Sequence, residues 1–422
     1  MGHRIRVNDI VLITLSGDDR PGITAGVSGI LAQYAVNVLD IGQAVIHATL
    51  SMGLLLEIPG NVPRPELAEA LQAFAGSHAL QWRWQDISQE SYGDWVSAQG
   101  RARYITTLLA RKITADQVAR VSTVFSRHGL GIDGISRLSG RIPLGELPPL
   151  SKACVEFSLR GPLPDLAAFR KELLEVASEL EVDLAFQEDN MYRRNRRLVA
   201  FDMDSTLIEA EVIDELARLA GVGERVSAIT ERAMRGELDF AASFRERVAL
   251  LKGLPETALE EVAAKLRITE GARHLIATLR LLGYKTAILS GGFTYFAERL
   301  QQQLGIDYVH ANELEIADGV VTGEVNGVIV DGERKAALLR QLATLEGIDL
   351  QQVIAVGDGA NDLPMLSIAG LGIAFRAKPL VQQSAEQSIS TLGLDAILYL
   401  LGISDRYQPP PSDLAPDRFE RV

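Results

Sequence analysis

Two aspartates separated by one residue follow a short apolar run near the middle of the chain. Residues 198–201 are Leu, Val, Ala and Phe, and Asp202 and Asp204 come next. The run predicts a buried strand of a parallel sheet, whose polar tip lies at the carboxyl edge where open α/β folds place ligands. Residues i and i+2 of an extended chain point to the same side. Two such carboxylates repel each other unless a cation or a shared proton separates them, which is a reason to expect Mg²⁺.

Other polar elements occupy equivalent places in the same half of the chain. Strand-like runs at 285–290, about 307–311 and 352–357 alternate with helical segments. The polar residues near their ends, or at the start of a helix, are Ser290, Gly291, Lys335, Asp358, Asn361 and Asp362. Since the carboxyl ends of parallel strands meet at one edge of a sheet, we expect these groups to gather around Asp202.

The Asp-x-Asp-x-Thr, Ser-Gly-Gly, Lys and Gly-Asp-Gly-x-Asn-Asp elements, in this order, resemble the haloacid dehalogenase superfamily of phosphotransferases over about residues 198–400. The resemblance implies an α/β, Rossmann-like core in which positioning and charge neutralisation drive phosphoryl transfer. It implies that Asp202 is the nucleophile and becomes an aspartyl-phosphate. Asp204 would protonate the leaving alkoxide and later activate water.

The same resemblance assigns the other core residues. Mg²⁺ would bind the Asp202 carboxylate, the Asp204 backbone carbonyl and the Asp358 carboxylate. Asp362 would lie behind these ligands or near the metal. The groups that would hold the phosphoryl oxygens are the Ser290 hydroxyl, the Gly291 amide and the Lys335 ammonium.

Residues of about 207–270 interrupt the alternation of strands and helices, because they look helical throughout. The expected helices lie at 209–220, 223–234, 239–251 and 256–266. A helical insertion here resembles the cap of the superfamily, which excludes water and supplies specificity. Within it, Glu211 offers an anion for an ammonium group and Arg247 a guanidinium for a carboxylate, as a zwitterionic amino acid requires.

The segments that resemble the phosphoserine phosphatase family are 205–217, 233–234, residue 240 and 243–248. This resemblance implies that Glu211 binds the amino group and Arg247 the carboxylate of O-phospho-L-serine. Met234 and Phe240 would line the pocket, and Asn361 would contact the phosphate or the substrate. The implied reaction releases L-serine and phosphate, as the last step of serine biosynthesis.

Two alternatives stay open. The mechanism could act on phosphothreonine, another small phosphate ester or a phosphoprotein, although the pair Glu211 and Arg247 favours a ligand of amino-acid size. The chain could instead be an amino-acid sensor whose phosphatase half is vestigial. The presence of Asp202, Lys335 and Asp358 speaks against that, because a vestigial site has no reason to keep all these groups.

The first 190 residues contain two copies of a βαββαβ pattern, which is typical of ferredoxin-like domains. The first copy is expected as a strand at 8–15, a helix that includes 23–31, strands at 36–48 and 51–58, a helix at 64–76 and a strand at 80–87. The second is expected as a strand at 104–110, a helix at 114–128, strands at 130–138 and 153–160, a helix at 164–179 and a strand at 181–187. The predicted domains are 1–95, 96–190 and 191–422.

The run Asp-Arg-Pro-Gly-Ile from Asp19 to Ile23 closes the first strand, opens the first helix and resembles an ACT domain. ACT domains bind small molecules, often amino acids, so the resemblance implies L-serine or another amino acid as effector. The loop residues expected to contact it are Gly17, Asp18, Asp19 and Gly22. The second copy lacks this run, so ligand binding and a packing or dimerisation role both stay open there. ACT modules often pair across subunits, which implies a homodimer.

Composition limits the class of protein. A net charge of −13 argues against a general nucleic-acid-binding surface. The single cysteine, Cys154, excludes an intrachain disulfide and is expected to be a buried thiol. No apolar run approaches the ~20 residues that cross a membrane, and the start does not resemble a signal peptide, so we expect a cytoplasmic enzyme. The basic run at 192–197 is expected to be a solvated linker or an interdomain contact.

Overall fold

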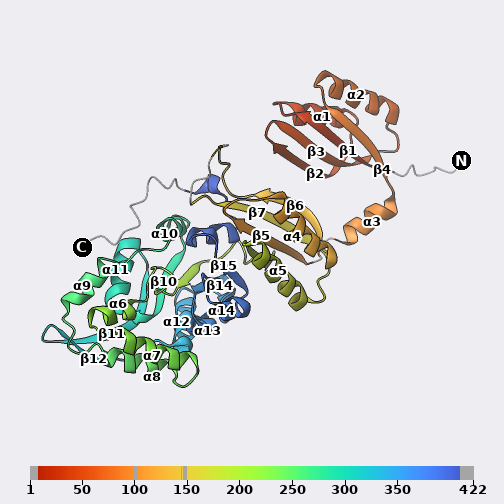
Figure 1. The fold of residues 1–422 in the computed structure, drawn as a ribbon. Coiled ribbons are helices and arrows are strands. Elements are labelled where there is room, and N and C mark those ends of the chain that lie inside the picture. The colour runs from red at the N-terminus through yellow and green to blue at the C-terminus, as the bar shows by residue number, and fades with distance from the viewer. Residues whose placement is uncertain (1–7, 99, 101, 144, 146–149, 409–422) are drawn as a thin grey trace. The chain divides into compact units, whose positions relative to one another are not determined.

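Three β-sheets organise the part of the chain that the computed structural model describes, which comprises residues 8–98, 100, 102–143, 145 and 150–408 (Figure 1). Contacts divide the chain into two units, Met1–Arg101 and Ala102–Val422. The first unit contains one sheet and the second contains two. Within the described residues, no helix is both long and apolar enough to cross a membrane.

The first unit is an antiparallel sheet with two helices packed on one face, as the first βαββαβ copy predicts. Its elements are β1 (Asp9–Asp18), α1 (Ile23–Gln33), β2 (Asn37–Ile46), β3 (Thr49–Ile58), α2 (Arg64–Ser77) and β4 (Gln81–Ile87), in the strand order β2-β3-β1-β4. Every second residue of β1 from Val11 to Leu15 is buried against α1 and α2, because strand side chains alternate between faces. A helix that the sequence did not predict, α3 (Gln89–Ser97), follows and is capped by the Ser88 hydroxyl.

The second copy has the same strand order. Its elements are β5 (Arg103–Ala110), α4 (Ala115–Arg127), β6 (Gly131–Arg137), β7 (Ala153–Arg160), α5 (Leu166–Leu180) and β8 (Asp183–Glu188), in the order β6-β7-β5-β8. Here both faces of the central strands are buried. Leu108 faces α4 and α5, whereas Leu109 and Cys154 pack into the core of the seven-stranded sheet that follows in the chain. Burial raises the pKa of the Cys154 thiol well above its ordinary value, so the predicted structural thiol is confirmed.

The catalytic layer is a seven-stranded sheet in the order β12-β11-β10-β9-β13-β14-β15. The strands are β9 (Leu198–Phe201), β10 (Lys285–Phe293), β11 (Tyr308–Ala317), β12 (Val320–Asn326), β13 (Val353–Gly357), β14 (Leu371–Phe375) and β15 (Gln387–Ile389). The helices that accompany them are α10 (Ala272–Leu281), α11 (Thr294–Leu304), α12 (Gly332–Leu345), α13 (Leu363–Ile368), α14 (Pro379–Ser384) and α15 (Ile397–Leu400). The four predicted strands are present, and β12, β14 and β15 extend the sheet. β9 pairs in parallel with both β10 and β13, which places Asp202 at the centre of the carboxyl edge.

The predicted helical insertion is present between β9 and α10. It contains α6 (Val212–Leu219), α7 (Gly223–Met234), α8 (Phe240–Ala249) and α9 (Thr257–Ala263). The chain enters and leaves it through two adjacent segments, 207–210 and 267–270, which we call the cap hinge. The Glu209 amide donates to the Arg267 carbonyl and the Thr269 amide to the Leu207 carbonyl, both at 2.9 Å. The insertion is therefore joined to the sheet by a short two-stranded hinge.

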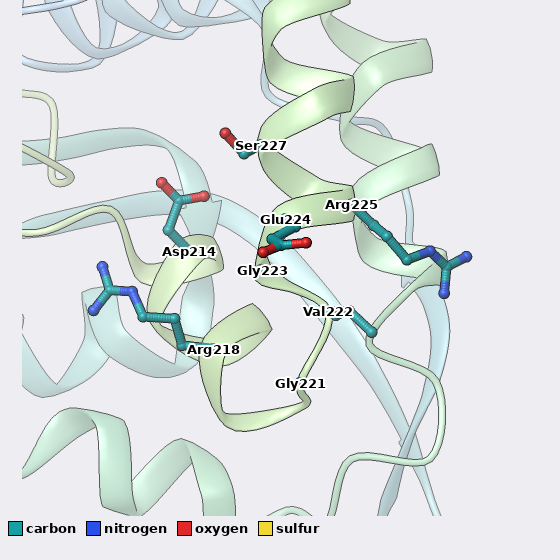
Figure 2. Close-up of a pocket in the computed structure, with 8 residues that line it drawn as sticks. All are labelled: Asp214, Arg218, Gly221, Val222, Gly223, Glu224, Arg225 and Ser227. Carbon is teal, nitrogen blue, oxygen red and sulfur yellow. The ribbon is translucent and has the colours of Figure 1, made fainter.

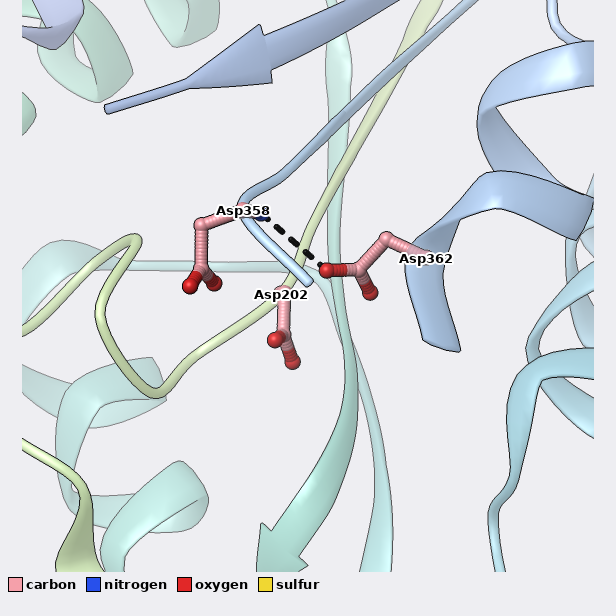
Figure 3. Close-up of side chains that lie close together, drawn as sticks. All are labelled: Asp202, Asp358 and Asp362. Atoms are coloured by element: carbon pink, nitrogen blue, oxygen red, sulfur yellow. Dashed lines mark hydrogen bonds between the residues drawn. The ribbon is translucent and has the colours of Figure 1, made fainter. Parts of the chain in front are cut away.

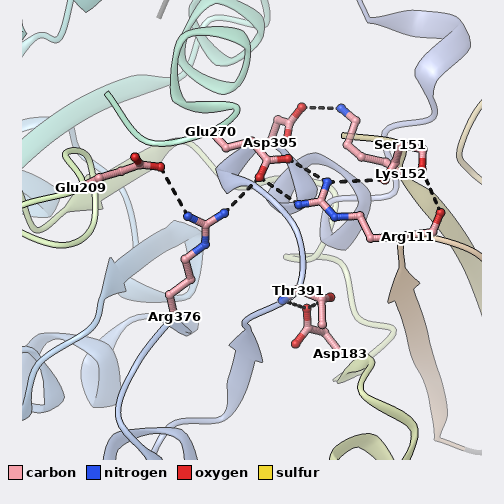
Figure 4. Close-up of polar contacts among 9 residues, drawn as sticks. All are labelled: Arg111, Ser151, Lys152, Asp183, Glu209, Glu270, Arg376, Thr391 and Asp395. Atoms are coloured by element: carbon pink, nitrogen blue, oxygen red, sulfur yellow. Dashed lines mark hydrogen bonds and ion pairs between the residues drawn. The ribbon is translucent and has the colours of Figure 1, made fainter. Parts of the chain in front are cut away.

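Hydrogen bonds tie the second copy to the catalytic sheet. The Gln387 side chain of β15 accepts from the Phe186 amide at 2.8 Å and donates to the Phe186 carbonyl at 2.5 Å. The Asp183 carboxylate accepts from the Thr391 amide at 2.8 Å (Figure 4). It also accepts from the Ser390 amide at 2.8 Å. In the basic run, the buried Arg193 donates to Glu156 of β7, so this residue forms an interdomain contact, whereas the buried Arg196 donates to the Gln351 carbonyl. The boundaries of the three predicted domains stay a prediction, since contacts divide the chain only after residue 101.

A partly buried ion-pair network also crosses this junction (Figure 4). Arg111 of the second copy donates to both oxygens of Glu270 in the cap hinge, at 2.8 and 2.9 Å. Arg376, after β14, donates to Glu270 at 3.0 Å and lies 3.7 Å from Glu209. The network joins the second copy to both segments of the cap hinge.

Replacing Arg111 with alanine is expected to lower the melting midpoint of the protein, because the bidentate pair couples two parts of one unit by about 1 kcal/mol. Glu270→Gln should lower it similarly, and the double variant should fall no further than the worse single variant. Arg141→Ala, at an exposed arginine of the same repeat, is the matched control and should melt like the parent. Strictly additive losses from Arg111→Ala and Glu270→Gln would contradict the coupling.

Candidate active site

The end of the central strand positions the two aspartates differently. The Asp202 amide donates to the Val356 carbonyl at 2.8 Å, which continues the pairing of β9 with β13 and holds a buried Asp202 at the sheet edge. The chain then turns through Ser205, which has a φ of 56°. The Asp204 carboxylate accepts a hydrogen bond from the Val212 amide at 3.1 Å, at the start of α6. Asp204 thus lies between the sheet edge and the cap.

Lys335 lies beneath Asp202, in the first turn of α12. Its ammonium is fully buried and donates to the carboxylates of Asp202 at 2.8 Å and Asp362 at 2.7 Å. Burial alone lowers the pKa of a lysine, but these two carboxylates outweigh it and raise the pKa of Lys335 above its ordinary value. The ammonium is therefore a fixed positive charge at the sheet edge.

Three carboxylates meet at this edge (Figure 3). One oxygen from each of Asp202, Asp358 and Asp362 lies within 4.8 Å of the others. The second Asp362 oxygen accepts from the amides of Asp358 at 3.1 Å and Gly359 at 2.9 Å. Both Asp362 oxygens therefore already hold other groups in place, whereas Asp202 and Asp358 retain oxygens that can bind a cation. A side chain at residue 357 would collide with Asp362, so this turn requires glycine.

The electrostatics of the cluster fit a divalent cation. Burial raises the pKa of Asp202 to about 7 and that of Asp358 to about 8, and neighbouring carboxylates add to both shifts. Burial also raises the pKa of Asp204 well above its ordinary value, with Glu211 as the next largest cause. Lys335 supplies a single positive charge. The carboxylates of the cluster thus outnumber this one ammonium. Mg²⁺ prefers carboxylate oxygens as ligands and would balance their charge.

The Ser-Gly-Gly element lies against the same edge. The buried Ser290 hydroxyl, in the second half of β10, accepts from the Gly292 amide at 2.9 Å. A side chain at residue 292 would collide with the Asp204 carboxylate. Asn312 of β11, which the sequence did not single out, donates to the Gly291 carbonyl and accepts from the Val330 amide, both at 2.8 Å. This buried asparagine holds the Ser-Gly-Gly element in place. In the sequence, the only sign of this role is one amide side chain beside a strand-like run.

The cap brings part of the predicted pocket to the catalytic edge. Phe240, the first residue of α8, covers Gly291, since a Cβ at that glycine would lie 2.8 Å from the Phe240 ring. Glu211 accepts from the Ser205 hydroxyl at 2.8 Å. Burial raises the pKa of Glu211, although the residue keeps exposed surface, and Arg247 opposes this shift. Burial lowers the pKa of Arg247, against the attraction of Asp214, Glu211 and Asp204.

Two residues predicted to contact the substrate, Met234 and Asn361, have few contacts with the rest of the site. Met234 is 64% exposed at the end of α7, where its sulfur lies 4.0 Å from the Lys378 ammonium. Asn361 folds back over Gly359. A depression of about 660 Å³ beside α6 and α7 is lined by Asp214 and Ser227 among others, but by none of the predicted pocket residues (Figure 2).

Sequence reasoning missed three supporting contacts. The Thr206 hydroxyl donates to Asp358 at 3.3 Å, and Ser205 holds Glu211. Lys378, exposed after β14, is close enough to Glu211 to favour its ionised form. Ser205 and Thr206 belong to the Asp-x-Asp-x-Thr motif, whereas nothing in the sequence around Lys378 sets it apart from a surface lysine.

Comparisons with known proteins identify the family of the chain. The family model for haloacid dehalogenase-like hydrolases matches residues 199–367, and that for the ACT domain matches residues 9–85. A Salmonella enterica serovar Typhi structure of a haloacid dehalogenase family hydrolase is 33% identical with a TM-score of 0.61, covering 70% of this chain and 98% of that one. The fold and the site thus define a haloacid dehalogenase-like hydrolase with an N-terminal ACT domain.

The relatives narrow the class further. A phosphoserine phosphatase of Streptomyces coelicolor is 42% identical over 407 residues, which cover 96% of this chain and 95% of the relative. Phosphoserine phosphatase SerB2 of Mycobacterium tuberculosis is 41% identical over 404 residues, which cover 93% of each. A probable phosphoserine phosphatase structure from Vibrio cholerae has a TM-score of 0.57 at 37% identity, covering 72% of this chain and 87% of that one. The chain belongs to the phosphoserine phosphatase family.

Proposed function

We propose that the protein hydrolyses O-phospho-L-serine to L-serine and phosphate, as the last step of serine biosynthesis. The observation that carries this proposal is the buried Asp202–Lys335–Asp362 cluster, with Glu211 and Arg247 of the cap beside it. The Asp202 carboxylate of this cluster can accept a phosphoryl group. Glu211 and Arg247 can pair with the ammonium and the carboxylate of an amino acid.

The first half-reaction transfers the phosphoryl group to the protein. An Asp202 oxygen bonds to phosphorus while the bond from phosphorus to the serine oxygen breaks. Asp204 gives its proton to the departing serine oxygen. The raised pKa of Asp204 supports this role, because a buried carboxyl keeps its proton nearer to neutral pH.

The second half-reaction restores the protein. A water oxygen bonds to phosphorus and the bond from phosphorus to the Asp202 oxygen breaks, which releases phosphate. Asp204, now ionised, takes the proton from that water. The Lys335 ammonium, the Ser290 hydroxyl and the Gly291 amide hold the phosphoryl oxygens throughout.

The metal ligands in this proposal are the Asp202 carboxylate, the Asp204 backbone carbonyl and the Asp358 carboxylate. Mg²⁺ bound there would neutralise phosphoryl charge. Asp362 orients Lys335 and the turn at 358–359 through the hydrogen bonds described above. Met234, Phe240 and Asn361 complete the proposed substrate pocket.

Phosphate release from O-phospho-L-serine tests the proposal directly. The intact protein with Mg²⁺ should release phosphate, and chelation of the metal by EDTA should stop the release. O-phospho-L-threonine and p-nitrophenyl phosphate are the comparison esters. Preference for either comparison ester would leave the mechanism intact but refute the assigned substrate. Inactivity on all three would favour the sensor alternative.

Replacing Arg247 with alanine should raise KM for O-phospho-L-serine by about 10²-fold, because a charge-assisted pair with the substrate carboxylate is lost. Glu211→Gln should raise KM in the same direction. Release from p-nitrophenyl phosphate, which lacks both amino-acid charges, should change little. Arg245→Ala, at an exposed arginine of the same helix, is the matched control. An equal loss with both esters would show that Arg247 supports the fold rather than the substrate.

We also propose that an amino acid, with L-serine the first candidate, regulates the enzyme through the ACT region, and that the protein is a cytoplasmic homodimer. The loop from Gly17 to Gly22 supports an exposed contact, since Asp18, Asp19 and Gly22 are exposed. The edge strand β2 exposes Val38, Ile41, Val45 and Ile46, which supports pairing with a second copy. Unchanged amino-acid inhibition after replacement of Asp19 and Gly22 would refute the loop assignment.

A further inference from the structure

A cavity of about 450 Å³ lies where the second copy meets the catalytic sheet, away from the Asp202 cluster. Its walls come from α5 and β8 on one side, and from the α13–β14 turn and β15 on the other. The polar residues that line it include Arg170, Gln187, Glu188, Arg196, Ser367 and Glu386. Cavities of a few hundred Å³ between two folded layers are typical places for small ligands.

The walls of the cavity are held in place. β8 and β15 are joined through the two hydrogen bonds between Gln387 and the Phe186 backbone. Asp183, at the other end of β8, accepts the three hydrogen bonds of Ser390 and Thr391. A cavity with such walls is preformed, so a ligand would not have to order it.

Arg196 is the unusual residue of this cavity. It is 4% exposed, and no carboxylate of the described chain lies within 4.0 Å of its guanidinium. One nitrogen donates to the Gln351 carbonyl, and a side chain at residue 370 would collide with that nitrogen. The Nε atom is buried without a partner among the described residues. Burial lowers the pKa of Arg196 to about 10, despite the opposite influence of Glu386. A buried cation without a countercharge is costly, which points to an anionic group that is supplied from outside.

Two neighbours add further unmet hydrogen-bonding capacity. Arg170 lies 3.7 Å from Glu386, a long ion pair, and its Nε is buried without a partner in the described chain. Gln187 is 8% exposed; its amide nitrogen donates to the Leu400 carbonyl, but its Oε1 accepts from no described group. The walls therefore offer guanidinium donors together with the carboxylates of Glu188 and Glu386.

We propose that this cavity binds a free amino acid, with its carboxylate on Arg196 and Arg170 and its ammonium on the Glu188 or Glu386 carboxylate. A zwitterion matches both the guanidinium groups and the carboxylates of the walls, whereas the two glutamates would repel inorganic phosphate. This proposal adds an effector site, partly formed by the second copy, to the proposed regulation by amino acids. It depends on the proposed function only in calling the ligand a regulator. Binding itself is measured without catalysis.

The test is isothermal titration calorimetry of the intact protein with each of the twenty protein amino acids, and with succinate and inorganic phosphate. Two variants change the cavity: Arg196→Met removes the cation, and Ser367→Tyr fills the space from its exposed rim. Arg194→Met, at an exposed arginine of the same segment, is the matched control. Melting curves report whether each variant folds, and Ser367→Tyr decides the question if Arg196→Met does not fold.

At least one amino acid should bind the intact protein and Arg194→Met equally, and bind both cavity variants about tenfold or more weakly. An amino acid that binds at the active site or at the Gly17–Gly22 loop should have the same affinity for the intact protein and for all three variants. If every amino acid that binds shows this equal affinity, the proposal is overturned. Failure of every amino acid to bind would also overturn it. Arg196-dependent binding of phosphate or succinate alone would refute the zwitterion. Failure to hydrolyse O-phospho-L-serine would refute the proposed substrate while leaving these titrations unaffected.

Discussion

Asp202→Asn is expected to reduce phosphate release from O-phospho-L-serine by a factor on the order of 10⁴ or more. The amide has the shape of the carboxylate but lacks the negative oxygen that would bond to phosphorus, so no covalent intermediate forms. It also weakens the proposed metal site by removing one charged ligand. Steady-state phosphate release gives the rate, and acid quenching after mixing with ³²P-labelled substrate gives the fraction of protein that carries label. The parent should carry label and the variant should carry none.

Asp318→Asn is the matched control for this experiment. Asp318 is exposed in the β11–β12 turn with a φ of 52°, a conformation that asparagine tolerates. Its activity and labelling should equal those of the parent. Labelled protein in Asp202→Asn would assign the nucleophile to another residue and remove the central step of the proposed mechanism.

Lys335→Met carries the second large expected effect, a fall in kcat of about 10² to 10³-fold. Methionine keeps much of the length of the side chain but removes the positive charge that is bonded to Asp202 and Asp362. The phosphoryl oxygens would lose one stabilising group. The two carboxylates would also lose their counter-charge, and removing one partner of a buried ion pair costs about 3 to 5 kcal/mol of stability. The melting midpoint should therefore fall together with kcat.

Lys252→Met, at an exposed lysine of the cap, should change neither quantity. A variant of Lys335 with full stability and lost activity would show that the ammonium acts on substrate but does not balance the buried carboxylates. Retained activity with lost stability would assign it a structural role only.

The sequence by itself determined the order of elements and the catalytic edge. Strand-like runs and helical segments with period 3.6 predicted both βαββαβ copies and the four cap helices, because these patterns follow from local geometry. Short continuous apolar runs predicted four adjacent strands of the catalytic sheet, β11, β10, β9 and β13. Asp202, Asp358 and Ser290 each stand at the end of such a run, and parallel strands bring these ends together. The role of each residue in the reaction stays a prediction.

Only the tertiary structure decided which groups meet across long separations in the chain. The bond of Lys335 to both Asp202 and Asp362 and the loop contact of Asn312 depend on packing that no local pattern encodes. The short strands β14 and β15 were missed because a run of three to five residues carries little periodicity, and no polar motif marks their ends as one does at the similarly short β9 and β13. The second copy joins the catalytic sheet through Gln387, Asp183 and Arg111, whose partners lie more than 150 residues away. Arg196 looked like part of a basic linker, and only the folded chain buries it, because burial depends on what packs around a residue and not on its neighbours in sequence.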